Sequence, residues 1–60
     1  MTNNIEPNAV YTTKEAAKLL KVSKSFLDRD RGEKQRIPFV KMGGVIRYRG
    51  RDLIAYLDSL

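Results

Sequence analysis

The sequence predicts a small α+β domain in which two short helices are followed by a β-hairpin and a third helix. Helical patterns occupy about residues 13–20, 24–31 and 50–60, and a Gly-Gly pair separates two runs of β-branched and aromatic residues before the last helix. A chain of 60 residues forms one domain with a small core, because folding at this size hides only about 60% of the unfolded surface. Residues 1–9 are polar and aperiodic, so we expect a flexible N-terminal arm followed by a domain over residues 10–60.

A capping box predicts where the first helix begins. Thr12 stands three residues before Glu15 in "TTKE", so the hydroxyl and the carboxylate can each accept a hydrogen bond from an amide at the helix start. The apolar residues Ala16, Ala17 and Leu20 then form one narrow stripe. The small alanines allow a second helix to approach closely.

Ser23 is the expected N-cap of the second helix, which follows a very short turn. Helical spacing places the apolar side chains of this segment on one side, namely Val22, Phe26 and Leu27. The opposite face consists of polar and charged side chains, namely Lys24, Ser25, Asp28 and Arg29. Gly32 is well placed to end the helix.

Gly43 and Gly44 predict a tight hairpin turn, which needs positive φ angles. If they form the whole turn, the facing pairs are Phe39 with Tyr48, Val40 with Arg47, and Lys41 with Ile46. Phe39, Ile46 and Tyr48 would then face the core, and Arg47 and Arg49 would face the other side. A slip by one residue would reverse this assignment.

The last helix has a clear apolar stripe. Its members, spaced at i, i+3, i+4 and i+7, are Leu53, Tyr56, Leu57 and Leu60. Asp52 near the start suits the helix dipole. We expect the five aromatic residues of the chain to pack in the core rather than to stack on bases; they are Tyr11, Phe26, Phe39, Tyr48 and Tyr56.

The positive charge is concentrated in the middle of the chain. All twelve Lys and Arg residues lie between Lys14 and Arg51, where only four acidic residues accompany them. This concentration is expected of a protein that binds a polyanion, although a solvated surface that keeps a protein soluble is the alternative.

Several classes of function are not expected from this composition. The sequence contains no cysteine and no histidine, which removes disulfides, thiolate chemistry, the usual zinc sites and histidine acid–base catalysis. We therefore expect no catalytic residue, no metal and no cofactor. No apolar run approaches the roughly 20 residues of a membrane span and the first residues lack a secretory signal, so we expect a soluble, cytoplasmic protein without a membrane partner.

The order helix, turn, helix, hairpin, helix is that of a winged helix-turn-helix. An α-helix fits the major groove of B-DNA, and a two-stranded ribbon reaches the neighbouring backbone or minor groove. Glycines at the hairpin tip would let the backbone approach phosphates closely.

Two stretches, "YTTKEAAKLLKVSKSFL" and "IPFVKMGGVIRYRGRDLIAYL", resemble the excisionase-type, MerR-like winged helix-turn-helix DNA-binding domains of bacteria, phages and mobile elements over about residues 10–59. The shared features are a Thr-x-x-Glu-Ala-Ala start, a Leu-x-Val-Ser turn, a Pro before the wing, Gly and Arg-aromatic in the wing, and a closing Asp-Leu. The matching residues are Thr12, Glu15, Ala16, Ala17, Leu20, Val22, Ser23, Pro38, Gly43, Gly44, Arg47, Tyr48, Asp52 and Leu53. The resemblance implies that the second helix enters the major groove of double-stranded DNA.

The candidate DNA contacts lie around the second helix and on the hairpin. They are Lys21, Ser23, Lys24, Ser25, Arg29, Lys41, Gly43, Gly44, Arg47 and Arg49. Arg29 suits bidentate reading of guanine, and Lys24 and Ser25 suit phosphate. Asp28 either accepts from a cytosine amine or, as we prefer, pairs with Lys24 or Arg31. Arg47 has a structural alternative, an ion pair with an acidic residue in segment 28–33.

Three hypotheses for function follow. The favoured one is a sequence-specific DNA binder of the excisionase kind, a recombination directionality factor that bends attachment-site DNA, works beside an integrase of the tyrosine recombinase class and associates cooperatively with itself on DNA. The second is a small transcriptional regulator of a phage or mobile element. The third is a basic protein-interaction module that binds an acidic partner.

Overall fold

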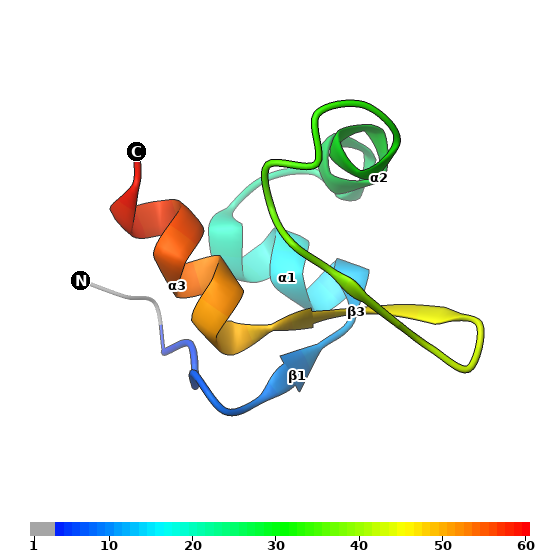
Figure 1. The fold of residues 1–60 in the computed structure, drawn as a ribbon. Coiled ribbons are helices and arrows are strands. Elements are labelled where there is room, and N and C mark those ends of the chain that lie inside the picture. The colour runs from blue at the N-terminus through cyan, green and yellow to red at the C-terminus, as the bar shows by residue number, and fades with distance from the viewer. Residues whose placement is uncertain (1–3) are drawn as a thin grey trace.

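A computed structural model describes residues 4–60 as three helices and a three-stranded sheet (Figure 1). The elements in chain order are β1 (Val10–Tyr11), α1 (Thr13–Leu20), α2 (Lys24–Gly32), β2 (Val40–Met42), β3 (Val45–Arg49) and α3 (Gly50–Asp58). The predicted fold class is confirmed: the molecule is a small α+β winged helix-turn-helix, with α1 and α2 as the helix pair and β2 and β3 as the wing.

The hairpin has the predicted register. Val40 faces Arg47, Lys41 faces Ile46 and Met42 faces Val45. Gly43 and Gly44 have φ angles of 57° and 92°, the positive pair that a two-residue turn matching the twist of the strands requires. Phe39 precedes β2, and its ring lies 6.5 Å from that of Tyr48 between centroids.

Both predicted helix starts are confirmed. The Thr12 hydroxyl accepts from the amide of Glu15 at 3.1 Å, and the Glu15 carboxylate accepts from the amide of Thr12 at 2.9 Å. The Ser23 hydroxyl accepts from the amide of Phe26 at 3.1 Å. Lys21 ends α1 in the left-handed conformation, with φ 59° and ψ 42°, and so turns the chain within three residues into α2.

The core lies between the helices and one face of the sheet. Its fully buried side chains include Leu27 of α2, Tyr48 of β3 and Leu53 of α3, together with Ile37 from the loop before β2. All the other aromatic residues pack partly buried against this cluster, as predicted. The predicted stripe of α3 needs one correction, because α3 ends at Asp58 and leaves Leu60 83% exposed.

Part of the segment before α1 packs against the rest of the domain. Residues 1–3 lie outside the described residues, but Ile5 is only 6% exposed within the core cluster. The carbonyls of Pro7 and Ala9 accept hydrogen bonds from the amides of Arg51 and Gly50 at 3.1 and 2.9 Å. Residues 5–9 therefore contact the domain that we expect to begin at residue 10.

The strand β1, which gives the sheet its third strand, is not predicted by the sequence pattern. The strand order is β1-β3-β2, and Val10 faces Arg49 while Tyr11 faces Tyr48. Because facing residues share a face, Tyr11, Ile46 and Tyr48 lie toward the helices. We call the opposite side of the sheet the outer face; its strand positions are Val10, Val40, Met42, Val45, Arg47 and Arg49.

Candidate nucleic-acid interface

The exposed side of α2 is polar and carries both charge and hydrogen-bonding groups. Lys24, Ser25, Asp28 and Arg29 are all exposed there, as predicted, while Leu27 and Asp30 are buried on the other side. The first turn of α2 contains no acidic residue. Its free amides and positive dipole end are therefore available to an anion such as a phosphate.

Asp28 is engaged within α2, which confirms the preferred prediction of pairing. Its carboxylate accepts from Lys24 Nζ at 3.0 Å and from Arg31 Nη2 at 2.5 Å. The hydrogen bond from Lys24, followed by that from Arg31, lowers the pKa of Asp28 below its ordinary value of 3.8. By contrast, Arg29 makes no ion pair or side-chain hydrogen bond with any residue in 4–60.

Arg31 fixes α2 to the rest of the domain. Its Nη1 donates to the Thr13 hydroxyl of α1 at 3.3 Å and to the Tyr48 hydroxyl of β3 at 2.9 Å. Burial lowers the pKa of the guanidinium, but the hydrogen bonds to Tyr48 and Asp28 outweigh burial, so the pKa is raised and Arg31 stays charged. This side chain therefore links α2 to both α1 and β3.

Asp30 organises the loop between α2 and the wing, a role that the sequence analysis did not identify. Its carboxylate accepts from the amides of Arg36 and Ile37 at 3.3 and 3.2 Å and from Arg36 Nε at 3.3 Å. The Arg36 guanidinium also lies over the Phe26 ring, 5.9 Å from its centroid. The only available signal was an acidic residue within a helix, and that pattern usually indicates a solvated face.

The wing presents candidate contacts at its tip. Lys41 is exposed and shares the helix-side face of the sheet with Ile46, and Gly43 and Gly44 are exposed at the turn. Arg47 is partly buried, and its Nη1 donates to the carbonyl of Ile46 at 2.7 Å. The alternative of an ion pair between Arg47 and segment 28–33 is absent from the contacts of the described residues.

The structure divides the predicted site residues into two groups. Figure 1 shows α2 and the hairpin tip projecting on the same side of the molecule, away from α3 and the C-terminus. Lys21 and Ser23, at the turn before α2, belong to this group. Arg49 does not, because it ends β3 roughly 13 Å along the strand from the tip, at 3.3 Å per residue, and lies on the outer face.

Residues 4–60 contain neither a metal-binding cluster nor a membrane-spanning helix. No group of three or more His, Cys, Asp or Glu side chains is placed to hold a metal ion. No helix in this part of the chain has the length and apolar character needed to cross a membrane.

Comparison with known proteins agrees with the fold. The family model described as a helix-turn-helix domain matches residues 10–60, which is most of the chain. No curated protein and no solved structure is significantly similar. The family match supports sequence-specific binding of double-stranded DNA, because the helix pair places one helix where it can enter the major groove. With its helix pair, its wing and this match over residues 10–60, the chain belongs to the helix-turn-helix domain family.

Proposed function

We propose that the protein binds a specific double-stranded DNA sequence by placing α2 in the major groove and the hairpin tip against the adjacent backbone. The observation that carries this proposal is the exposed side of α2, where Arg29 is uncommitted while Asp28 is neutralised by two basic neighbours. A free guanidinium can donate two hydrogen bonds to guanine O6 and N7, which discriminates that base from the others. Arg29 is therefore the proposed base-reading residue.

The other candidate residues position the duplex. Lys24 and Ser25 lie in the first turn of α2, where phosphate is favoured, and Lys21 and Ser23 flank that turn. At the wing, Lys41 and the exposed glycines offer an ammonium group and close backbone approach, whereas Arg47 lies on the outer face of the sheet. A domain of this size would bury about 600–1,000 Å² of protein surface on DNA, so several copies bound side by side would increase specificity.

The biological role that we favour is an excisionase-like recombination directionality factor. The support is the motif resemblance over residues 10–59 together with the winged fold. In this role the protein would bind attachment-site DNA cooperatively, bend it, and favour excision by an integrase of the tyrosine recombinase class. The second candidate is a small transcriptional regulator of a phage or mobile element, which the same fold and motifs also support.

Selection of bound duplexes from a randomised DNA pool, sequenced after several rounds at near-physiological salt, tests the proposal. We expect an enriched motif, with direct repeats at a fixed spacing for a cooperative array and inverted repeats for a dimeric regulator. If about five phosphates are neutralised, log K should fall against log salt with a slope near −4.5. A slope near zero with no enriched motif would overturn DNA binding, and an enriched site that is bound without bending would favour the regulator.

A matched pair of variants tests the role of α2. Arg29→Gln should cost about 1–3 kcal/mol of binding free energy on the selected site and relax the preference at one base pair. Arg51→Gln removes the same charge from an exposed residue outside α2 and the wing tip. It should therefore weaken DNA binding less than Arg29→Gln, and by the same factor for every DNA sequence. Equal losses for the two variants would contradict base reading by Arg29.

A further inference from the structure

The outer face of the sheet is unusually apolar for a surface that nothing covers. A sheet packed on one side only is expected to alternate between apolar core positions and polar solvent positions. Here four of the six outer strand positions are apolar, namely Val10, Val40, Met42 and Val45. Val10, Met42 and Val45 are 46%, 49% and 46% exposed, and they are three of the four exposed large apolar residues among residues 4–60.

The remaining groups on this side are cationic. Arg47 and Arg49 occupy the other two outer positions, and Arg51 follows at the start of α3. None of the outer strand positions is acidic, and within residues 4–60 the three arginines make no ion pair, since the ion pairs lie on α2 and the loop after it. The face therefore combines apolar surface with uncompensated positive charge.

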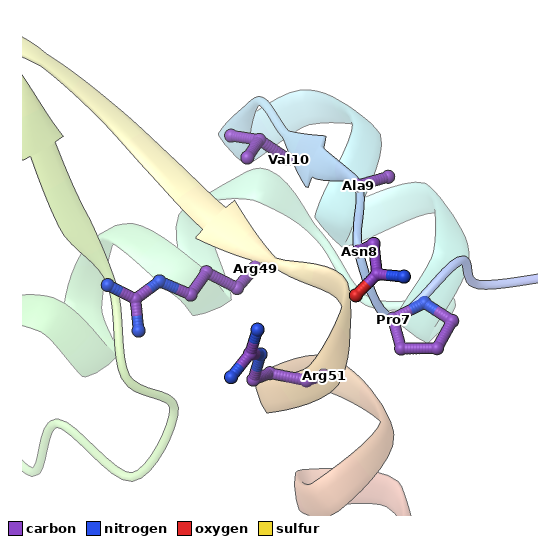
Figure 2. Close-up of a pocket in the computed structure, with 6 residues that line it drawn as sticks. All are labelled: Pro7, Asn8, Ala9, Val10, Arg49 and Arg51. Carbon is purple, nitrogen blue, oxygen red and sulfur yellow. The ribbon is translucent and has the colours of Figure 1, made fainter.

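A pocket at one end of the outer face concentrates this charge. It has a volume of about 210 Å³ and is lined by Pro7, Asn8, Ala9, Val10, Arg49 and Arg51. In Figure 2 the side chains of Arg49 and Arg51 extend to the same side of the chain, with α1 and α2 behind the strands. No lining residue is acidic, so the two guanidinium groups lack a carboxylate that could bind between them.

We propose that the outer face binds an amphipathic helix of a partner protein that carries carboxylates beside apolar side chains. In α+β domains, an apolar sheet face is typically covered by a helix. β1 lies beside residues 48–49 of β3 and β2 beside residues 45–47, so the outer face is a narrow strip that one helix of about 10–12 Å diameter can cover. The apolar side of such a helix would cover Val10, Val40 and Val45, and one of its carboxylates would enter the pocket between Arg49 and Arg51.

Charge and position favour this occupant over the alternatives. A second copy bound through the same face would bring its arginines against those of the first, which is repulsive. DNA would pair with the arginines but would leave the exposed valines and Met42 without apolar contacts, since protein–DNA interfaces are more polar than protein–protein interfaces. A duplex on α2 also approaches from the helix side of the sheet, so the outer face stays accessible when DNA is bound.

Display selection of helical peptides against the full chain bound to duplex DNA tests the proposal. We expect enriched peptides to be acidic and amphipathic, with a Kd on the order of 10 µM for so small a surface. Titration of the enriched peptide should shift the backbone NMR signals of β1, β3 and the start of α3, and leave those of α2 unchanged. Enriched peptides without acidic residues, or shifts confined to α2, would overturn the proposal.

Two variants separate the apolar and the charged contributions to peptide binding. Val10→Thr with Val45→Thr keeps the branched shape and strand preference of both positions, and it should weaken binding about tenfold. Arg49→Gln with Arg51→Gln should weaken it by at least as much and reduce its dependence on salt. Unchanged peptide affinity in both double variants would contradict the proposal.

Matched controls distinguish this surface from the DNA interface. Leu60→Ser removes the remaining exposed large apolar residue, and Arg29→Gln removes a charge from α2; neither should change peptide affinity. The Val→Thr pair should leave DNA affinity unchanged. If duplex DNA alone shifts the signals of Val10, Arg49 and Arg51 as strongly as those of α2, the outer face is part of the DNA interface and the proposal fails. If the unaltered protein did not bind DNA at all, that result would instead contradict the proposed function.

Discussion

Gly50 lies where two backbone segments meet with no room for a side chain. A Cβ atom at this position would lie 1.8 Å from the Glu6 carbonyl oxygen and 2.7 Å from its carbonyl carbon. These are backbone atoms, so a rotamer change cannot relieve the overlap. This constraint could not be predicted from local sequence, because the contact joins the start of α3 to a segment more than 40 residues earlier.

Gly50→Ala should therefore destabilise the protein by about 3 kcal/mol or displace the N-terminal segment from α3. Gly32→Ala is the matched control, because a Cβ there meets nothing within 4 Å and Ala suits a helix better than Gly. We expect the control to be neutral or to stabilise by up to about 1 kcal/mol. Urea unfolding, monitored by circular dichroism, measures the stability of the two variants. Equal stability of the two would contradict the close contact.

Asp30 has an equally specific role at a buried site. The side chain is 3% exposed and accepts from two backbone amides of the loop that leads into β2, one of which belongs to the buried Ile37. Asp30→Ala leaves these amides without a partner, which should cost about 2–3 kcal/mol in unfolding free energy. Asp30→Asn keeps one acceptor oxygen and should cost less. A loss below about 0.5 kcal/mol for Asp30→Ala, measured by chemical unfolding, would contradict this role.

At the scale of an element, Asp28 stabilises α2 through its pairing with Lys24 and Arg31. Its pKa is lowered by Lys24 and Arg31, so the carboxylate stabilises the fold above the ordinary pKa of 3.8 and this contribution is lost as the pH falls through the lower folded value. Asp28→Asn should be slightly less stable than the unaltered protein at pH 7, and the difference should disappear in strong acid. Urea unfolding of both proteins from pH 7 to pH 2 measures this.

The same substitution should affect DNA binding in the opposite direction. Asp28→Asn removes a negative charge from the proposed groove-facing side and frees Lys24, so affinity for any duplex should rise by about two- to fivefold. Fluorescence anisotropy with a selected and a scrambled duplex measures the change. Weaker binding to the selected duplex alone would instead indicate that Asp28 accepts from a base, the alternative that the sequence left open.

The elements that could be predicted are those specified by local chemistry. The capping box of Thr12 and Glu15, the Ser23 cap and the Gly43-Gly44 turn each depend on residues a few positions apart, and each is present as expected. What could not be predicted depends on distant partners. β1 is two residues long and is a strand only because β3 lies beside it, and Ile5 sits in a polar stretch without periodicity.

The candidate site shows the same division. Helical spacing predicted the exposed side of α2 and the pairing of Asp28, because both depend on positions three or four residues apart. Spacing within the chain could not show that Arg31 reaches Thr13 and Tyr48, or that Arg49 lies with Arg51 at the far end of the wing from its tip. Those placements follow from how the helices and sheet pack together.

At the scale of the whole molecule, the N-terminal segment contributes to a small core, and the free energy of unfolding of such a domain is low. A 60-residue domain has roughly 3–9 kcal/mol of stability, at 0.05–0.15 kcal/mol per residue. Ile5 is buried in the core, and residues 7 and 9 accept the hydrogen bonds of two amides at the start of α3. Loss of this segment would remove an apolar contact and two hydrogen bonds together.

Deletion of residues 1–9 should therefore lower the unfolding free energy by about 3–5 kcal/mol and leave much of the protein unfolded at 37 °C. Ile5→Ala alone should cost about 2–4 kcal/mol, whereas Pro7→Ala, at an exposed position whose carbonyl is retained, should cost little. Thermal unfolding followed by circular dichroism gives the three midpoints. If the deletion variant had the same unfolding midpoint as the full chain, residues 5–9 would be the loose arm that their composition suggests. The contacts with Gly50 and Arg51 would then not contribute to the stability of the fold.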